Sequence, residues 1–322
     1  MNVLVTSAGR RTSLVQAFVK AAKAAGGRVV AGDLSSLAPA LYLAHQGVPL
    51  PRVDSAEYVP HLLSLVQEHQ IKLVVPTIDT ELAVLAQNAD AFSEVGAAAL
   101  ISEPTFIDIC GDKWLTYKAF AEKGVDTAMS WLPGDYDADE LPEHLFVKPR
   151  DGSASRDIYS VPTGELERYL PRVPNAIIQE ELSGHEITID ALLDLSGRPL
   201  HYVPRRRIRT LAGESIQGIT LPDDELRDWL IHVLNVISNL GARGAVTLQA
   251  FLSERGPVLT EVNPRFGGGF PLAYAAGGKY PDWLLAMLRG ERVPERFGEY
   301  QVGLYMTRYN TEYFTAEPLW SV

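Results

Sequence analysis

Short apolar runs alternate with longer amphipathic stretches over the first hundred residues. The runs are rich in Val, Ile and Leu, and the stretches between them repeat apolar residues at helical spacing. The predicted strands are residues 3–6, 29–32, 71–75 and 97–101, and the predicted helices are 13–25, the segment after 54–55, and 80–92. Because helices separate these strands along the chain, we predict a parallel sheet covered on both faces, an α/β domain.

The pattern changes near residue 112. A helix is predicted over 112–123, and strand-like runs then follow one another closely, separated by turns with Gly, Pro and Asp. These runs are residues 145–148, 158–161, 176–181, 186–193 and 200–208, with a short helix at 165–170. A long amphipathic helix over 224–240 precedes two further strands, 245–252 and 258–263. We therefore predict an α+β fold with antiparallel sheet, and a domain boundary near residue 105.

Composition narrows the class of protein. The 322 residues are 46% hydrophobic, and 29 Lys and Arg stand against 40 Asp and Glu, a net charge of −11. This length predicts two or three domains, and the acidic balance argues against nucleic-acid binding. Cys110 is the one cysteine, which excludes a disulfide scaffold, and its apolar surroundings favour a buried structural role over a nucleophile. Proline and glycine interrupt the uncharged run 34–51, so we expect no membrane span and a cytoplasmic location.

The last two predicted strands carry the clearest chemical signal. Side chains alternate between the faces of a strand, so Glu261 and Asn263 share a face, and pairing of the strands brings Gln249 close to Glu261. Three oxygen-bearing side chains without a neighbouring thiol or imidazole suit Mg²⁺. Arg265 lies two residues further on, within reach of a transferred phosphoryl group. A hairpin with a solvated polar face explains the spacing equally well.

Two further segments are compatible with nucleotide binding. Lys148 ends a predicted strand and precedes the small residues 152–155, an arrangement in which backbone N–H groups and a lysine hold phosphate. Residues 177–186 join two strands through a polar linker, where Glu186 is placed to bind ribose hydroxyls. A surface lysine at an ordinary turn and a solvated charged turn are the simpler interpretations, and each motif taken alone favours them.

Two common nucleotide signatures are missing from the sequence. There is no G-x-x-x-x-G-K-[ST], which excludes a P-loop NTPase, and no G-x-G-x-x-G after the first strand. Asp33, at the end of the second strand, occupies the place of the acidic ribose-binding residue of dinucleotide folds. The turn after the first strand, however, contains only one glycine, Gly9. The sequence therefore gives weak support to a dinucleotide site.

Taken together, these segments resemble one protein superfamily. From residue 112 to about 278 the sequence is similar to the ATP-grasp superfamily, most of all to one synthetase unit of the carbamoyl-phosphate synthase large chain and related carboxylate–amine ligases. The strongest element is Glu261-Val262-Asn263-Pro264-Arg265 with Gln249 upstream. The resemblance implies a Rossmann-like pre-ATP-grasp domain over 1–104, a small ATP-grasp subdomain over 105–182, and a large subdomain with the metal site and a C-terminal tail over 183–322.

The resemblance also implies roles for residues around the nucleotide. Lys113 and Lys148 match the basic residues on the ATP phosphates, and Gly152 and Ser153 match the start of the loop that closes over them. The segment that reads adenine is matched by Glu180, Glu181 and Leu182, and the ribose-binding acid by Glu186. The ligands of Mg²⁺, or of Mn²⁺, are matched by Gln249, Glu261 and Asn263, and Arg265 matches the arginine beside the acyl acceptor.

Charged side chains on two other strands admit two interpretations each. Arg205, Arg207 and Arg209 alternate along one strand. The resemblance places them at the active-site wall, where Arg209 binds a substrate carboxylate, whereas an exposed basic edge strand is the alternative. Asp79 and Glu81 follow a parallel strand at the edge where open α/β sheets bind ligands. They contact a substrate, or Asp79 caps the following helix, which is the favoured interpretation.

The activity implied by the resemblance is phosphoryl transfer from ATP to a carboxylate, bicarbonate or carbamate, followed by capture of the acyl phosphate by an amine or ammonia. We expect ATP and Mg²⁺ as cofactors, small-molecule carboxylate and amine substrates, and neither nucleic acid nor membrane as a partner. A homodimer is compatible with the family. No glutaminase nucleophile is visible, so ammonia would come freely or from a partner. Because the chain is long enough for one synthetase unit only, we favour a small ligase that acts on an amino acid over carbamoyl phosphate synthesis.

Two other functions compete with this hypothesis. An NAD(P)-dependent oxidoreductase would use the N-terminal domain, but it leaves Gln249, Glu261 and Asn263 unexplained. An ATP-binding subunit without turnover would keep the same nucleotide residues and lack the reaction. Release of ADP with the right substrate distinguishes the ligase from the subunit, and nicotinamide binding would favour the oxidoreductase.

Overall fold

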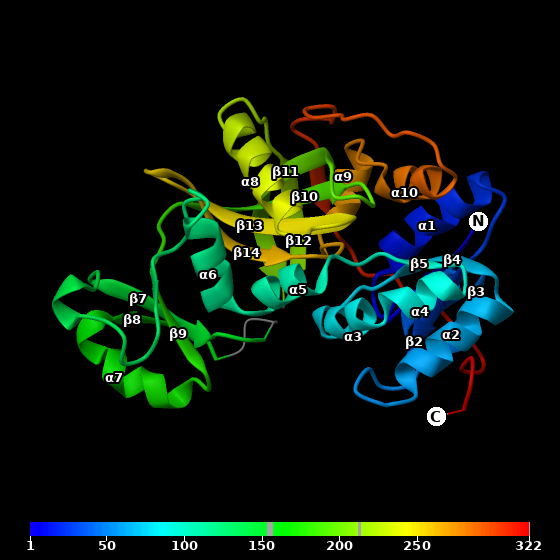
Figure 1. Cartoon of the computed structure of the whole chain (residues 1–322), viewed down its shortest axis with the longest axis horizontal. Coiled ribbons are helices and arrows are strands. Elements are labelled where there is room, and N and C mark those ends of the chain that lie inside the picture. Colours follow the sequence, from blue (N-terminus) through cyan, green and yellow to red (C-terminus); the bar gives the residue numbers. More distant parts are fainter. Residues whose placement is uncertain (153–156, 212–213, 322) are drawn as a thin grey trace.

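The computed structural model describes residues 1–152, 157–211 and 214–321 of the chain (Figure 1). The described strands form three sheets that follow one another along the sequence. In Figure 1 the four-stranded sheet lies at the left, the six-stranded sheet in the centre, and the five-stranded sheet at the right. The fold class is confirmed: an α/β N-terminal domain precedes an α+β fold with antiparallel sheets.

The N-terminal sheet is parallel and has the order β3-β2-β1-β4-β5. Its strands are β1 (Asn2–Val5), β2 (Val29–Asp33), β3 (Gln46–Pro49), β4 (Ile71–Val75) and β5 (Ala98–Ala99). One face packs against α2 (Tyr58–Glu68), α3 (Leu82–Gln87) and α4 (Ala89–Glu94), and the other against α1 (Thr12–Ala24). Two short 3₁₀ helices, η1 (Pro39–Leu43) and η2 (Asp79–Glu81), follow β2 and β4. Because the strands are parallel, their C-terminal ends meet at one edge.

Two helices near the end of this domain differ from the sequence prediction. The helix predicted over 80–92 is divided at Asn88, whose side-chain amide donates to the carbonyl oxygen of Val84 (2.8 Å) between α3 and α4. The apolar run that contains Cys110 forms a helix that the sequence analysis does not predict, α5 (Pro104–Gly111). Pro104 stands at the start of α5, where its missing N–H removes no helical hydrogen bond.

The six-stranded sheet has the order β14-β13-β10-β11-β12-β15 and forms the centre of the molecule. Its strands are β10 (His185–Leu193), β11 (Pro199–Leu211), β12 (Glu214–Thr220), β13 (Ala245–Ser253), β14 (Gly256–Asn263) and β15 (Tyr305–Thr307). One face is apolar and packs against α5, α6 (Lys113–Ala121) and α8 (Arg227–Asn239). Two helices on the opposite side, α9 (Phe270–Ala275) and α10 (Tyr280–Leu288), pack against α1 of the N-terminal domain.

The four-stranded sheet forms a separate arm (Figure 1). Its strands are β6 (Ser130–Trp131), β7 (His144–Pro149), β8 (Tyr159–Pro162) and β9 (Ala176–Glu180), in the order β6-β9-β7-β8. A small core lies between this sheet and α7 (Leu166–Tyr169), with 3₁₀ turns η3 (Ala138–Glu140), η4 (Thr163–Glu165) and η5 (Leu170–Arg172). Arg255, in the turn between β13 and β14, binds Glu180 at the end of β9 (2.5 Å) and so fastens the arm to the central sheet.

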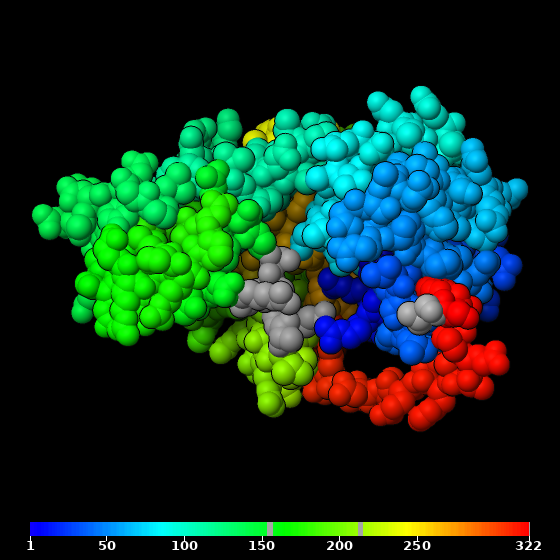
Figure 2. Space-filling view, turned by 90° about the horizontal axis from the view of Figure 1, so that it is seen from below, coloured from blue at the N-terminus to red at the C-terminus, as the bar shows by residue number. Residues whose placement is uncertain are grey.

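The C-terminal segment crosses from the central sheet to the N-terminal domain. After β15 it runs along the lower side in Figure 2, in red, and a hollow separates it from the blue N-terminal domain before the two meet. The rings of Tyr313 and Tyr42 contact each other at a tilt, with centroids 4.6 Å apart, and Trp320 packs at the edge of the core around α1. Among the described residues, no helix combines the length and the apolar character needed to cross a bilayer.

Candidate active site

The β13–β14 hairpin brings the predicted metal ligands together. Gln249 pairs directly with Glu261, so the predicted proximity of these two residues is confirmed. Asn263 lies one pleat further along, and its side-chain amide donates to Glu261 Oε1 (3.0 Å). A bulge at this point places Thr260 outside the regular pairing. Without the bulge Leu259 and Glu261 would share a face, whereas with it Leu259 enters the core and Glu261 joins the polar face.

Neighbouring strands extend this polar face. Thr188 on β10 pairs with Gln249, and Glu186 lies two residues earlier on the same face. Arg207 on β11 forms an ion pair with Glu186 and lies 3.5 Å from Gln249 Oε1. The predicted ribose-binding acid and the predicted metal ligands therefore share one surface of the central sheet, opposite the apolar face that packs against α8.

Two lysines face this surface from other elements. Lys148 is half-buried near the end of β7, and burial together with the charge of Lys113 lowers its pKa to about 8. The carboxylates of Glu261 and Glu186 act on the Lys148 pKa in the opposite direction. Burial also lowers the pKa of Lys113, against the field of Glu261. These interactions show that α6, β7, β10 and β14 bring two cations and two carboxylates within electrostatic reach of one another.

Local contacts fix Lys113 opposite Lys148. Asp112 caps α6 by accepting the backbone N–H of Trp114 (2.9 Å), and the same carboxylate pairs with Arg150 (2.6 Å) just after β7. Lys113 Nζ donates to the carbonyl oxygen of Gly152 (3.0 Å). Gly152 itself has a φ of +99°, a conformation that favours glycine. Ser153 and the rest of the predicted phosphate loop to 155 lie outside the described residues.

The predicted adenine-reading segment lies where the arm joins the central sheet. Glu180 accepts the backbone N–H of Met129 (2.8 Å) and pairs with Arg255, so its carboxylate braces the junction. Glu181 is exposed and donates its backbone N–H to His144 (3.3 Å), while Leu182 is half-buried. The side chain of Glu180 is therefore used in structural contacts. Only the backbone of residues 180–182 stays a candidate for binding adenine.

Arg265 reaches across to the N-terminal domain. Its Nε and Nη2 donate to the two carboxylate oxygens of Asp79, both at 2.7 Å, and Nη2 also donates to Asn263 Oδ1 (3.1 Å). The favoured interpretation of Asp79 as a helix cap is therefore wrong, since neither η2 nor α3 has a side-chain cap. The ion pair joins residues 186 positions apart in the sequence.

Three other sequence interpretations need correction. Glu81 is fully buried and accepts hydrogen bonds from Thr6 and Tyr58, so it does not face a substrate. The three arginines do not lie on an exposed edge, because β11 is an interior strand and Arg205 is 3% exposed. A register shift between Arg207 and Arg209 also breaks their alternation, and the side chain of Arg209 is exposed.

Asp33 and Cys110 both have structural roles. The carboxylate of Asp33 accepts the backbone N–H groups of Gly9 (2.7 Å) and Ser35 (2.9 Å), so it shapes the turns after β1 and β2. Cys110 is half-buried beside the core of the central sheet. Burial, assisted by the charges of Asp79 and Glu261, raises the pKa of its thiol, which disfavours the thiolate that a nucleophile requires.

Asp190 also contributes to the polar face, although it was not among the residues predicted from the sequence. It forms a buried ion pair with Arg205 (2.7 Å) on the polar face, beneath the loop 267–269. A Cβ on Gly269 would lie 2.3 Å from the guanidinium of Arg205, and one on Gly267 would lie 3.2 Å from Asp190 Oδ1. The signal was the alternation of Glu186, 188 and 190 along one strand, which places all three side chains on the same face.

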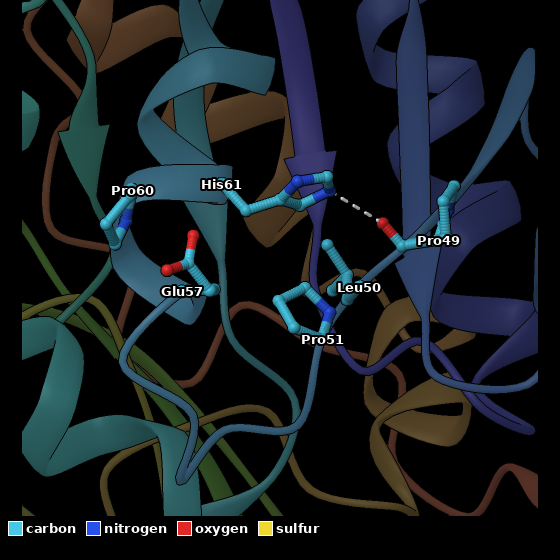
Figure 3. Close-up of a pocket in the computed structure, with 6 residues that line it drawn as sticks. All are labelled: Pro49, Leu50, Pro51, Glu57, Pro60 and His61. Atoms are coloured by element: carbon cyan, nitrogen blue, oxygen red, sulfur yellow. Dashed lines mark hydrogen bonds between the residues drawn. The ribbon is translucent and has the colours of Figure 1, made fainter.

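A separate cavity lies in the N-terminal domain, away from these residues (Figure 3). It has a volume of about 450 Å³ and lies between the end of β3 and the start of α2, where Glu57 and His61 line it together with prolines. The ring of His61 contacts the carbonyl oxygen of Pro49 (2.9 Å). None of the predicted site residues lines this cavity.

Comparisons with known proteins support the fold. The chain has 17% identity and a TM-score of 0.74 with the biotin carboxylase domain dimer of 2-oxoglutarate carboxylase from Hydrogenobacter thermophilus, in complex with MgADP, ADP and bicarbonate, covering 94% of this chain and 73% of that one. With N5-carboxyaminoimidazole synthetase from Staphylococcus aureus it has 13% identity and a TM-score of 0.72, and the match covers 94% of this chain and 79% of that one. With L-amino acid ligase from Bacillus licheniformis it has 19% identity and a TM-score of 0.67, and the match covers 89% of this chain and 74% of that one.

Two family models match consecutive parts of the sequence. Residues 3–100 match a PylC-like N-terminal domain, and residues 172–312 match an ATP-grasp domain of a biosynthetic pathway with the Ter operon. A search of curated proteins found no match. The second match contains Gln249, Glu261, Asn263 and Arg265, and the first contains Asp79. The chain therefore contains a PylC-like N-terminal domain followed by an ATP-grasp domain.

Proposed function

We propose that the chain is an ATP- and Mg²⁺-dependent, ADP-forming ligase that joins a carboxylate to an amine. A carboxylate oxygen, from an acid, bicarbonate or carbamate, attacks the γ-phosphorus of ATP, and the bond from this phosphorus to ADP breaks. The nitrogen of an amine or ammonia then attacks the acyl carbon, phosphate leaves, and the nitrogen loses a proton. The observation that carries the proposal is the convergence of Lys113, Lys148 and Glu261 from three separate elements.

The two lysines and the arm hold the nucleotide in this proposal. The charge of Lys113 lowers the pKa of Lys148, so a polyphosphate between the two lysines would relieve this repulsion. Gly152 and Ser153 would supply backbone donors to the phosphates, in the manner of a phosphate-binding loop. Ribose hydroxyls would bind Glu186, and adenine would bind the backbone of residues 180–182.

The metal ligands fit Mg²⁺ by their chemistry. Gln249, Glu261 and Asn263 offer one carboxylate and two amide oxygens at one end of the hairpin. Mg²⁺ prefers oxygen ligands and takes few from the protein, and when bound it supplies positive charge to the transferred phosphoryl group. Within residues 1–152, 157–211 and 214–321, no cluster of three or more His, Cys, Asp and Glu forms a competing metal site.

Arg265 holds the reacting carboxylate in this proposal. Its guanidinium lies beside Asn263, next to the metal ligands, and so at the end of the site where the γ-phosphate would meet the acyl acceptor. Arg209, which is exposed on β11, is a second candidate for the substrate carboxylate. Such a reaction needs positioning and charge neutralisation rather than a covalent nucleophile, which agrees with the raised pKa of the Cys110 thiol.

The remaining assignments follow from the same proposal. Each of the ranges 1–104, 105–182 and 183–322 holds one described sheet, which supports the proposed division, although α5 and α6 pack against the central sheet. A homodimer is supported by the dimeric biotin carboxylase domain among the similar structures.

The single cysteine fits a reducing cytoplasm. An ammonia-supplying partner is needed only if ammonia, rather than an amine, is the acceptor.

Calorimetric titration with Mg²⁺ and the non-hydrolysable analogue AMPPNP tests the nucleotide site. We expect metal-dependent binding in the wild type, and Lys148→Ala and Glu261→Ala each to weaken it at least about tenfold, since each removes a charged contact. Lys118→Ala, an exposed lysine on α6, is the matched control and keeps wild-type affinity. If all three variants bind AMPPNP with wild-type affinity, the proposed nucleotide site is wrong.

Two further measurements separate the competing functions. Titration with NADPH in parallel tests the oxidoreductase: tight binding without AMPPNP binding would assign the activity to the N-terminal domain. Release of ADP on addition of carboxylate and amine pairs tests turnover. A protein that binds AMPPNP but releases no ADP from ATP with any pair would favour the non-catalytic subunit instead.

A further inference from the structure

The ion pair between Arg265 and Asp79 occupies the place where a substrate carboxylate would bind. Asp79 comes from η2, just after β4 of the N-terminal sheet, and Arg265 follows the metal-binding hairpin. Both N–H···O distances are 2.7 Å, and the carboxylate lies against Nε and Nη2 of the guanidinium. This two-point geometry is the one by which arginine recognises carboxylates.

The donors of Arg265 are almost fully used. A guanidinium has five N–H groups. Two point to Asp79, a third points to Asn263, and Nη1 donates to the carbonyl oxygen of Phe266 (3.2 Å). One N–H of Nη1 remains for other contacts. An incoming carboxylate can therefore bind Arg265 through two hydrogen bonds only if it replaces Asp79.

Replacement has a consequence for charge. The Arg265 side chain is 13% exposed and that of Asp79 is 32% exposed, so solvent shields their pair only in part. A simple carboxylate on Arg265 would leave Asp79 without its cation, which is unfavourable in a partly buried site. Lys113 is within electrostatic reach of Asp79, but it also faces Glu261, Asp151 and Asp112, which compete for its charge.

A substrate with two opposite charges avoids this cost. If its carboxylate takes the place of Asp79 on Arg265, its ammonium group can bind the released carboxylate of Asp79. One ion pair is then exchanged for two, and no charge is left unpaired. Discrimination by an unpaired charge against the wrong ligand is a common source of specificity.

We propose that Asp79 is a specificity-determining residue that selects, as the carboxylate substrate, a molecule with a neighbouring ammonium group, namely an amino acid. This inference rests on the proposed ligase function and deepens it by naming the substrate class. Asp79 belongs to the N-terminal domain, so that domain contributes a contact to the substrate as well as support to the sheet.

Ligand binding to the enzyme saturated with Mg²⁺ and AMPPNP tests the proposal. The probes are the twenty common amino acids and matched acids without the amino group, such as propionate for alanine and 3-phenylpropionate for phenylalanine. We expect at least one amino acid to bind wild type roughly tenfold or more tightly than its matched acid, the effect of one hydrogen bond between charged groups. In Asp79→Asn this ratio falls towards one, and in Asp79→Glu, which keeps the charge, it is partly restored.

The control is Asp54→Asn, which breaks an exposed ion pair with Arg52 (2.9 Å) in the same domain and leaves the ratio unchanged. The proposal is overturned if matched acids bind as well as amino acids, if no amino acid binds, or if Asp79→Asn keeps the wild-type ratio. Failure of wild type to bind Mg²⁺ and AMPPNP would reject the ligase function itself. Normal AMPPNP binding without amino-acid selectivity would reject this inference alone.

Discussion

Lys148 carries its charge in a place where burial and a second lysine both disfavour it. Its pKa of about 8 lies below the ordinary value of 10.5. The folded protein therefore binds fewer protons at Lys148 than the unfolded chain does between these two pH values. The group lowers the free energy of unfolding below pH 8, and this penalty is relieved as pH rises from 8 to 10.5. A bound phosphate would remove the penalty by supplying the missing negative charge.

Replacing Lys148 by Met should raise stability and remove binding at once. We expect Lys148→Met to increase the free energy of unfolding at pH 7 by about 1 kcal/mol, because it removes an unfavourable buried cation and keeps the apolar stem. Affinity for Mg²⁺ and AMPPNP should fall at least about tenfold. Urea unfolding and calorimetry measure the two effects, with the exposed lysine variant Lys118→Met as control. Lower stability at pH 7 would contradict the argument.

Glu81 is a carboxyl group whose neutral form is favoured by burial. Burial raises its pKa, while the hydrogen bonds from Thr6 and Tyr58 act in the opposite direction. Above its ordinary value of 4.5 the folded protein therefore binds more protons at Glu81 than the unfolded chain does. The contribution of Glu81 to the free energy of unfolding is therefore highest at low pH, and it decreases as pH rises through the raised pKa.

The variant Glu81→Gln should remove this dependence on pH. The amide oxygen still accepts from Thr6 and Tyr58, and nothing is left to ionise, so stability at pH 7 should rise by about 1 kcal/mol relative to wild type. Urea midpoints between pH 5 and pH 8 measure the slope. Glu68→Gln, whose side chain is 65% exposed, is the control. An unchanged slope in Glu81→Gln would show that Glu81 does not titrate on unfolding.

The C-terminal segment connects two sheets that are distant in the sequence. It adds β15 to the edge of β12, and Arg308 then hydrogen-bonds the carbonyl oxygen of Gly268 in the loop after Arg265. Further on, Leu319 lies against Gly47 on β3, where a Cβ would come within 2.5 Å of Leu319 Cδ1. Gly47 therefore provides the space in which the end of the segment docks.

A larger side chain at this position should release the segment. In Gly47→Val we expect Leu319 to be displaced and chymotrypsin to cleave the segment about tenfold faster, at exposed aromatic residues such as Tyr309 and Phe314, because cleavage follows the population of the open form. Gly164→Val is the matched control, since a Cβ there meets no atom within 4 Å. Equal cleavage of the two variants would show that the docking contact contributes nothing.

The sequence predicted elements well where their signal is local. The strands β1, β2, β4 and β5 of the N-terminal sheet and the β13–β14 hairpin follow from apolar patterning and short turns, whereas the edge strand β3 was not predicted. The three-residue strand β15 has no such signal, because its partner Gln217 lies about ninety residues away and the aromatic tail suits a docked or an exposed segment equally. The break of the helix at Asn88 depends on a side-chain hydrogen bond that periodicity does not register.

The same distinction holds for the candidate site. Gln249 and Glu261 were predicted to be close because one hairpin connects them. The contact of Arg265 with Asp79 depends on how the N-terminal domain packs on the central sheet, and so the local pattern favoured a helix cap instead. That packing is extensive: Gly244 lies against Leu100, and Glu103 donates its backbone N–H to Gly241 (2.9 Å).

The four-stranded arm is attached to this packed body at fewer points. Arg255 pairs with Glu180 and Asp126, and Arg150 pairs with Asp112 at the start of α6. Lys148 belongs to the arm, whereas Glu261 and Gln249 belong to the central sheet. A nucleotide held by both sides would therefore draw the arm towards the central sheet, with the N-terminal domain unmoved.

Small-angle X-ray scattering with and without Mg²⁺ and AMPPNP tests this motion. We expect the radius of gyration of wild type to decrease on binding, because a polyphosphate bridges cations on the arm to the metal ligands on the central sheet. Lys148→Met removes the arm's phosphate contact and should show no decrease at the same concentrations, whereas Lys118→Met should behave as wild type. A wild-type radius that stays constant at saturating AMPPNP would mean that the arm already holds its nucleotide-bound position. In that case the phosphate site is already formed before the nucleotide binds, and the lowered pKa of Lys148 reflects this arrangement. The change in the free energy of unfolding in Lys148→Met then measures how much the preformed site destabilises the protein.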